Sequence, residues 1–269
     1  MIDLLAVAPE ACRIAREAGR ILSEIYRGGQ FERHLKEDDT PVTSADLAAD
    51  AYLKQALSAL TPGVPVLTEE AADIPLAERA EWPEYWLVDP LDGTGEFIAG
   101  SGDFATLIAL VRHHQPVLGI VYAPESDTLY WAAQGEGAFK EAQGLSRPIH
   151  ARHHLVPPAT LTVAVSRRQA PESLTRRLSP EFDYERLPLG SSALKSCLVA
   201  EGVADCYVRL GPTGEWDTAA AQCIVSEAGG AILSLGLLPL SYNRRDSLEN
   251  PDFITLGDEG LPWSEILRP

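Results

Sequence analysis

The stretch "YWLVDPLDGTGEF", residues 85–97, runs from four apolar residues of strand character directly into Asp89 and Asp92. A Pro-Leu pair separates the two carboxylates, and a Gly-Thr-Gly sequence follows the second. Glycines at such a place suit a tight turn and a close approach of the backbone to a ligand. The pattern therefore predicts a strand that delivers two acids to a site at its end.

The composition restricts the classes of function. The chain has 269 residues, 45 % of them apolar, which is enough for one large domain or two modest domains that share a core. Lys and Arg total 22 against 39 Asp and Glu, a formal net charge of -17, so a field that would attract nucleic acid or anionic lipid is absent. We expect no nucleic-acid polymer as a partner, and any anionic substrate must be bound by local features.

The N-terminal segment carries charges where a signal peptide would be apolar, and no run of 18 uncharged apolar residues occurs. We expect a soluble, cytoplasmic protein without an integral membrane segment. Peripheral association with the inner membrane face and the oligomeric state are left open. The 4 cysteines form no C-x-x-C pair, and neither adjacent histidine pair, His113-His114 or His153-His154, has the i, i+4 spacing of a zinc helix, so we expect reduced thiols and solvated histidines.

Periodicity divides the chain into two halves, 1–152 and 153–269, at the polar, proline-bearing segment 150–160. The first half contains two predicted helices, at 3–27 and 44–60, and then a mostly antiparallel meander of short strands within 64–149. Pro41 excludes a helix before the second one, which Thr43 or Ser44 would cap.

The second half alternates between strands and helices. The predicted strands are 161–166, 184–189, 204–210 and 230–235, and the predicted helices lie near 171–179, 191–201 and 217–228. This alternation indicates an α/β half. The joint prediction is an α+β half that carries metal-site motifs and an α/β half that completes the site, with helices covering the sheets.

Acidic residues suited to a metal site occur at three separate places: Glu69 and Glu70, Asp89 and Asp92, and Asp217 at a predicted helix start. If they converge, each like-charged pair about 4 Å apart costs on the order of 4 kcal/mol at an effective dielectric constant of 20. Such a cluster needs cations. Hard oxygen ligands without His or Cys favour Mg2+.

The spacing of the motif fits this hypothesis. Asp89 and Asp92 can each reach a different ion or share one, and the turn between them exposes the carbonyl of Leu91 as a further oxygen ligand. The amides of the Gly-Thr-Gly sequence can meet a phosphate. An Asp-rich turn whose side chains bond their own backbone is the alternative, and the motif alone does not distinguish the two.

The strings "DPLDGT", "WDTAA" and "SEAGG" resemble the signature of the inositol monophosphatase superfamily of Mg2+-dependent, lithium-sensitive phosphatases. Residues 190–222 and 239–253 are similar to its 3'(2'),5'-bisphosphate nucleotidases. The resemblance extends from the first helix to about residue 256. It implies a layered αβαβα sandwich of the sugar-phosphatase type.

The resemblance also implies an activity, the Mg2+-dependent hydrolysis of the 3'-phosphate of adenosine 3',5'-bisphosphate to AMP and phosphate. 3'-Phosphoadenylyl sulfate is a second implied substrate. An inositol-phosphate monophosphatase would share the catalytic residues. A non-catalytic sensor that binds metal and nucleotide is an alternative from another class.

The resemblance implies two or three Mg2+ ions, two of which would share Asp89 as a ligand. Glu69, Asp89 and the carbonyl of Leu91 would bind one ion, and Asp89, Asp92 and Asp217 a second. This is the arrangement of a two-metal phosphatase.

The implied catalytic residues are Asp46, Thr94 and Glu69. Thr94, paired with Asp46, would position and deprotonate the attacking water. The implied substrate contacts are Glu69, Leu91, Asp92, Gly93, Thr94, Gly190, Ser191, Arg209 and Asp217. Lys195 and the pair Arg167-Arg168 are further cation candidates for a second phosphate.

Several residues of this set also have ordinary structural explanations. Asp46 follows Thr43 by three residues at a predicted helix start, where an acid stabilises the helix. Asp217, or Gly190 with Ser191, could simply cap a helix. The functional interpretation is favoured because chance would have to supply the whole set in order.

The chain departs from the resemblance at two positions. Gly95 stands where a Lys is common, which removes a positive charge near the phosphates and puts substrate affinity in doubt. Ala221 replaces a common Gly, and its methyl group should be tolerated in a helix.

Overall fold

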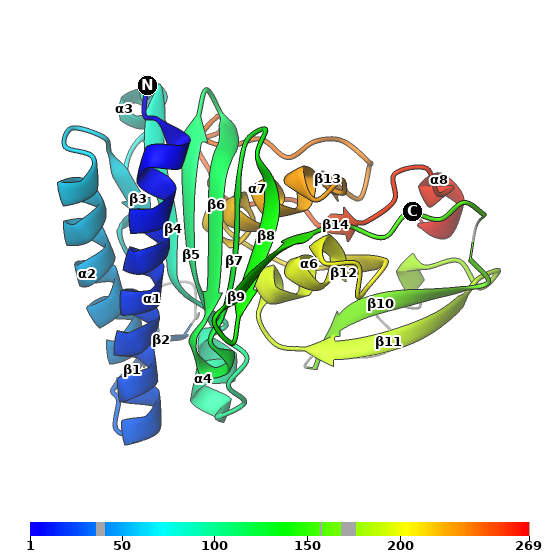
Figure 1. The fold of residues 1–269 in the computed structure, drawn as a ribbon, viewed down its shortest axis with the longest axis horizontal. Coiled ribbons are helices and arrows are strands. Elements are labelled where there is room, and N and C mark those ends of the chain that lie inside the picture. Colours follow the sequence, from blue (N-terminus) through cyan, green and yellow to red (C-terminus); the bar gives the residue numbers. More distant parts are fainter. Residues whose placement is uncertain (36–40, 157, 168–175, 269) are drawn as a thin grey trace.

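The computed structural model describes residues 1–35, 41–156, 158–167 and 176–268. Its elements form successive layers: α1 and α2, a seven-stranded sheet, α6 and α7, a five-stranded sheet, and α8 on the outer side (Figure 1). The expected layered α/β sandwich is confirmed.

The two helices of the first layer agree with the predicted ranges. They are α1 (Leu4–Gly28) and α2 (Ser44–Leu60). Gly29 ends the first helix in the left-handed conformation, with φ of 66°. Thr43, in the short strand β2 (Pro41–Thr43) that pairs with β1 (Arg33–Leu35), is the N-cap of the second. Apolar side chains of both helices pack on one face of the seven-stranded sheet.

The seven-stranded sheet has the order β3-β4-β5-β6-β7-β8-β9. Only the pair of β3 (Val66–Thr68) and β4 (Glu84–Asp92) is parallel, so the predicted antiparallel meander is confirmed. The other strands are β5 (Ala105–Arg112), β6 (Gln115–Ala123), β7 (Thr128–Ala133), β8 (Gly137–Ala142) and β9 (Leu145–Ile149).

Strand β4 carries a bulge between Asp89 and Asp92. Asp89 pairs with Leu107 and Asp92 with Ala105, so three steps along β4 oppose two along β5. In a regular strand, residues three apart point to opposite faces. The extra residue of a bulge re-aims the side chains beyond it, and Pro90, which lacks an N–H group, fits such an interruption of the ladder.

The five-stranded sheet has the order β11-β10-β12-β14-β13. The predicted strands of the second half are present as β10 (Thr160–Ser166), β11 (Asp183–Leu189), β12 (Cys206–Arg209) and β13 (Ala231–Ser234). The unpredicted β14 (Phe253–Leu256) lies between β12 and β13 and is antiparallel to both. The sheet is therefore mixed.

The helices of the second half differ from the predicted ranges in one place. Helix α6 (Ser192–Ala200) matches its prediction. The helix predicted at 217–228 instead begins as a 3-10 turn, η3 (Glu215–Asp217), and continues as α7 (Ala219–Glu227). Residues 171–175 of a third predicted helix lie outside the described part of the chain.

Short elements were not predicted because they are too brief to show a period. They are η1 (Glu69–Ala71), α3 (Leu76–Arg79), α4 (Thr94–Ala99), η2 (Pro124–Ser126) and α8 (Trp263–Ile266).

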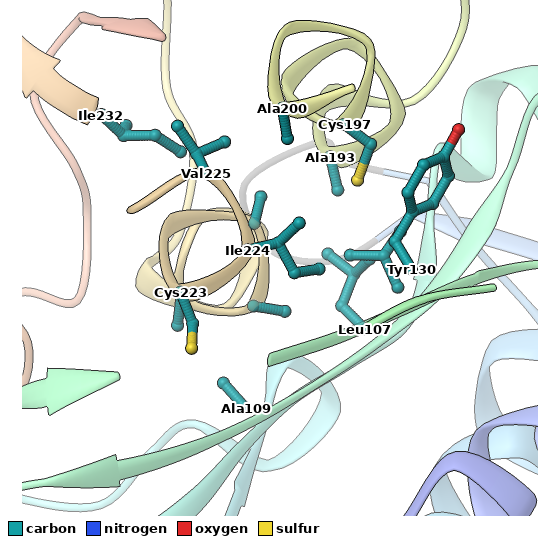
Figure 2. Packing of buried hydrophobic residues seen from close by; sticks show 14 of the residues in the cluster. Leu107, Ala109, Tyr130, Ala193, Cys197, Ala200, Cys223, Ile224, Val225 and Ile232 are labelled. Atoms are coloured by element: carbon teal, nitrogen blue, oxygen red, sulfur yellow. The ribbon is translucent and has the colours of Figure 1, made fainter. Parts of the chain in front are cut away.

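Helices α6 and α7 fill the space between the two sheets. Figure 2 shows Ala193 and Cys197 of α6 and Ile224 of α7 facing Leu107 and Tyr130 of the first sheet. Residues of both halves thus share one core cluster, and the division after residue 152 stays a prediction. Ala221 is 1 % exposed within the same cluster, so the core accommodates the methyl group that replaces a common Gly.

The cysteines are free, as expected, and three of the four are buried. Among the described residues, no helix has the length and apolar character needed to cross a membrane.

Gly119 of β6 allows α7 to approach the sheet closely. A Cβ atom there would lie 2.2 Å from the carbonyl oxygen of Ala220 and 2.9 Å from Cβ of Cys223. We predict that Gly119→Ala lowers the free energy of unfolding by about 1–3 kcal/mol, the usual cost of overpacking. Denaturant unfolding measures this change.

Gly28→Ala is the matched control, because nothing lies within 4 Å of its Cβ position and Ala favours a helix. Equal stability of the two variants would contradict the close contact between α7 and β6.

Candidate active site

Three carboxylates from separate parts of the chain meet at one point. Ligand oxygens of Asp89, Asp92 and Asp217 all lie within 4.8 Å of one another. Asp89 and Asp92 lie on β4 on the two sides of its bulge, and Asp217 ends η3. Asp89 is 1 % exposed and Asp92 5 % exposed, so water screens their charges poorly.

The electrostatics of this cluster include Glu69. Burial raises the pKa of Asp89 well above its usual range, and the charges of Glu69, Asp217 and Asp92 raise it further. Burial likewise raises the pKa of Asp217, with Asp92 and Glu69 as the next causes. Glu69 and Asp92 therefore lie close enough to Asp89 and Asp217 to disfavour the ionisation of these two acids.

The N-terminus of α6 holds Asp92. Its carboxylate accepts hydrogen bonds from Ser191 Oγ, from the Ala193 amide at 2.9 Å and from the Ser192 amide at 3.3 Å. Ser191 is also the N-cap of α6, since its Oγ accepts a hydrogen bond from the Leu194 amide at 3.1 Å. Ser191 thus caps the helix and contacts the acid cluster.

Asp217 does not cap α7. Thr218 occupies the N-cap position, and the Oδ2 atom of Asp217 instead accepts a hydrogen bond from the Gly214 amide at 2.5 Å. This bond holds the carboxylate against the residue before η3, where it lies beside Asp89 and Asp92 of β4. The N-cap explanation for this acid is therefore wrong.

Asp46 uses its two oxygens for different partners. Oδ2 accepts hydrogen bonds from the Thr43 amide at 2.8 Å and Thr43 Oγ1 at 2.6 Å, which completes the capping box of α2. Oδ1 lies 3.0 Å from Thr94 Oγ1, and the carbonyl of Leu91 lies 3.2 Å from the same hydroxyl. Burial raises the pKa of Asp46. The helix cap thus positions an acid against the hydroxyl of Thr94.

A cavity of about 260 Å³ opens beside these groups. It is lined by Pro41, Glu69, Asp92, Gly93, Thr94, Gly95, Glu96, Ser166, Ser191, Ser192, Lys195, Arg209 and Asp217. Asp46, Asp89, Leu91, Glu70 and Gly190 are not among the lining residues. Asp46 and the Leu91 carbonyl contact the lining residue Thr94 through its hydroxyl.

Sequence reasoning missed three lining residues: Pro41, Glu96 and Ser166. Ser166 ends strand β10, and the carboxyl end of a parallel strand is a usual place for a ligand, so this signal was available. Glu96 belongs to the short helix α4, which no periodicity revealed.

Lys195 and Arg209 bring positive charge to the cavity. Lys195 is 3 % exposed, its ammonium group donates to the carbonyls of Ser191 and Leu189, and it lies 5.0 Å from the ring centre of Tyr207. Burial lowers its pKa to about 8. Arg209 donates to the carbonyl of Pro212 at 3.2 Å.

The remaining candidates for substrate contact have other partners. The Gly190 amide donates to Asp103 Oδ2 at 2.9 Å, and a Cβ atom at Gly190 would lie 2.5 Å from Cβ of Asp103. Arg167 forms an ion pair with the same Asp103, and Arg168 lies outside the described residues. The structure therefore shows close packing at Gly190.

The donor set at the cluster suits a hard divalent ion. The three ligand atoms that meet there are all carboxylate oxygens, and the acids repel one another, a cost that a cation would relieve. The cluster of Asp89, Asp92 and Asp217 could therefore hold a metal ion.

A layered α/β sandwich with a carboxylate cluster beside a polar cavity is an arrangement that suits a metal-dependent phosphatase. Comparison with known families agrees, because the model of the inositol monophosphatase family matches residues 3–254. The chain belongs to the inositol monophosphatase family.

Relatives within this family share nearly the whole chain. The chain is 46 % identical over 259 residues to the 3'(2'),5'-bisphosphate nucleotidase CysQ of Aggregatibacter actinomycetemcomitans, covering 96 % of each protein. It is 44 % identical to CysQ of Haemophilus influenzae, covering 95 % of this chain and 94 % of that protein. The crystal structure of CysQ from Bacteroides thetaiotaomicron superposes with a TM-score of 0.75 at 36 % identity, covering 91 % of this chain and 94 % of the other.

Removing one charge from the cluster should stabilise the metal-free protein. Asn at position 89 keeps an oxygen for the Leu91 amide, 2.9 Å away, while it relieves repulsion by Glu69, Asp92 and Asp217. We predict that Asp89→Asn raises the unfolding temperature in a chelator by roughly 2–4 °C, which corresponds to about 1 kcal/mol. The same variant should lose most of the stabilisation that Mg2+ gives to the wild type.

Asp3→Asn is the control, since it also removes a charge and keeps an oxygen for the amides that Asp3 caps. A fall in unfolding temperature for Asp89→Asn in the chelator would show that repulsion does not dominate the cluster.

Proposed function

We propose that the protein is an Mg2+-dependent 3'(2'),5'-bisphosphate nucleotidase. It removes the 3'-phosphate of adenosine 3',5'-bisphosphate and releases AMP and phosphate, and 3'-phosphoadenylyl sulfate is a further candidate substrate. The observation that carries the proposal is the convergence of the carboxylate cluster and the Thr94–Asp46 pair. The names of relatives that are 43–46 % identical support the substrate class.

The proposed ligands fall into two overlapping groups. Glu69, Asp89 and the Leu91 carbonyl would hold one ion, and Asp89, Asp92 and Asp217 would hold another. When bound, Mg2+ supplies neutralisation of phosphate charge and activation of water. The chain's own contribution is to keep these acids together. It does so by the bulge in β4, the α6 amides at Asp92 and the Gly214 amide at Asp217.

Thr94 and Asp46 perform the proposed proton transfer. Thr94 Oγ1 donates a hydrogen bond to Asp46 Oδ1, which leaves a lone pair of Oγ1 to accept a hydrogen bond from the attacking water. As the water gives a proton to Oγ1, the hydroxyl proton of Thr94 passes to the carboxylate of Asp46. Asp46 cannot turn away, because Thr43 holds its other oxygen. Proton acceptance by a positioned pair of this kind typically contributes 10² to 10⁴-fold to the rate, roughly.

The proposed phosphate contacts combine backbone and cationic groups. Gly93 adopts the left-handed conformation, with φ of 97°, as it begins α4, and it lines the cavity with Thr94. Lys195 and Arg209 lie in the same cavity and suit a second phosphate group. A nucleoside bisphosphate carries such a group and an inositol monophosphate does not. The two cations therefore favour the nucleotide despite Gly95.

The test of the substrate class is phosphate release, measured side by side on adenosine 3',5'-bisphosphate, inositol 1-phosphate and fructose 1,6-bisphosphate. We predict the highest kcat/KM for the adenosine compound, and loss of release from all three substrates in a chelator. A higher kcat/KM for inositol 1-phosphate would assign the sibling activity. Mg2+-dependent binding of nucleotide without any phosphate release would assign the sensor function.

The role of Thr94 can be tested separately. We predict that Thr94→Val lowers kcat about 10² to 10⁴-fold, because Val keeps the shape and removes the hydroxyl that relays the proton. Thr94→Ser, which keeps the hydroxyl, should retain most activity. The stabilisation by Mg2+, measured as a rise in unfolding temperature, should be unchanged in both variants. If Mg2+ no longer stabilises Thr94→Val, the residue supports the metal site instead.

A further inference from the structure

Two sequence strings that pointed to the nucleotidases lie against each other in space. "GPTGEWD" is residues 211–217 and "LENPDF" is residues 248–253. The Glu215 amide donates to the Leu248 carbonyl at 2.8 Å, and the Asn250 amide donates to the Thr213 carbonyl at 2.8 Å. These bonds flank an antiparallel bridge between residues 214 and 249. The later string therefore supports the turn that carries Asp217.

The side chain of Asn250 reaches the centre of this turn. Its Nδ2 atom donates to the Gly214 carbonyl at 2.6 Å and to Thr218 Oγ1 at 3.1 Å. It is 7 % exposed, so water competes poorly for either acceptor. Asn250 thus joins the residue before η3 to the residue after it.

Gly214 connects this amide to the acid cluster. Its carbonyl accepts from Asn250 and, at 3.1 Å, from the backbone amide of Asp217, and its own amide donates to Asp217 Oδ2 at 2.5 Å. A side chain at Gly214 would collide with the Trp216 ring, at 2.2 Å from Cε2. A shift of Gly214 would therefore move the carboxylate of Asp217.

We propose that Asn250 is a positioning residue for Asp217: its side-chain amide fixes the turn from Gly214 to Thr218 and so aims the Asp217 carboxylate at Asp89 and Asp92. The inference rests on the proposed metal site. Groups that orient a metal ligand typically change metal affinity or activity 10- to 100-fold, roughly, when they are removed. A residue that only stabilises the fold changes the unfolding temperature alone.

The experiment measures binding of Mg2+ alone, without substrate, from the rise in unfolding temperature over an Mg2+ titration. Asn250→Leu keeps the shape of the side chain and removes its donors. We expect its Mg2+ midpoint to rise about tenfold relative to wild type. Thr255→Val is the control. It removes a buried hydroxyl that lies 2.9 Å from Ser196 Oγ, and it should lower the unfolding temperature without moving the midpoint.

Asn250→Asp provides a second variant if the Leu variant does not fold. It also removes the donors, but its added negative charge would by itself strengthen cation binding. A weaker Mg2+ midpoint in this variant supports positioning. An unchanged or stronger midpoint overturns it.

Asp217→Asn separates failure of this inference from failure of the proposed function. If Asp217→Asn weakens Mg2+ binding and the Asn250 variants do not, only the positioning role is overturned. If Asp217→Asn also binds Mg2+ as wild type does, the proposed metal site is overturned with it.

Discussion

Mutual repulsion between buried carboxylates is the constraint on which the site depends. Asp89, Asp92 and Asp217 lie within 4.8 Å of one another and Glu69 adds to the repulsion, so the fold holds together groups that would separate in water. At this spacing each charged pair costs on the order of 4 kcal/mol at an effective dielectric constant of 20. Many ordinary interactions elsewhere in the molecule must offset that cost.

Three local structures keep the acids in place. The bulge in β4 re-aims its two aspartates, the α6 amides and Ser191 hold Asp92, and the Gly214 amide holds Asp217. Each is anchored in a larger unit: the seven-stranded sheet, the helix layer between the sheets, and the segment before β14. The site lies where these units meet, so its geometry depends on the docking of both sheets.

The same arrangement reconciles a chain of net charge -17 with an anionic substrate. Attraction over a long range is absent, yet the cavity gathers Lys195 and Arg209 beside acids that suit a divalent cation. Recognition of a phosphate ester is then a local matter. The capping box of α2 also has two roles, because the carboxylate of Asp46 both caps the start of the helix and contacts the hydroxyl of Thr94.

Much of the fold and the list of candidate acids could be predicted from the sequence by itself. Helical and strand periods revealed α1, α2, α6 and most strands, and oxygen-only ligands at three places indicated a hard cation. Elements too short to show a periodicity were not found: α4 was missed, and η3 was predicted as the start of an α-helix. Strand β14 was also missed, because it pairs only with the strands β12 and β13 that precede it in the chain. Tertiary structure alone decided that the acids converge, that Gly190 packs on Asp103, and that Asn250 holds the turn of Asp217. The physical reason is that the periodicity of a sequence shows only which face of a helix or strand is buried. The contacts at the site join residues up to 128 positions apart, as between Asp89 and Asp217. They exist only once the two sheets have docked.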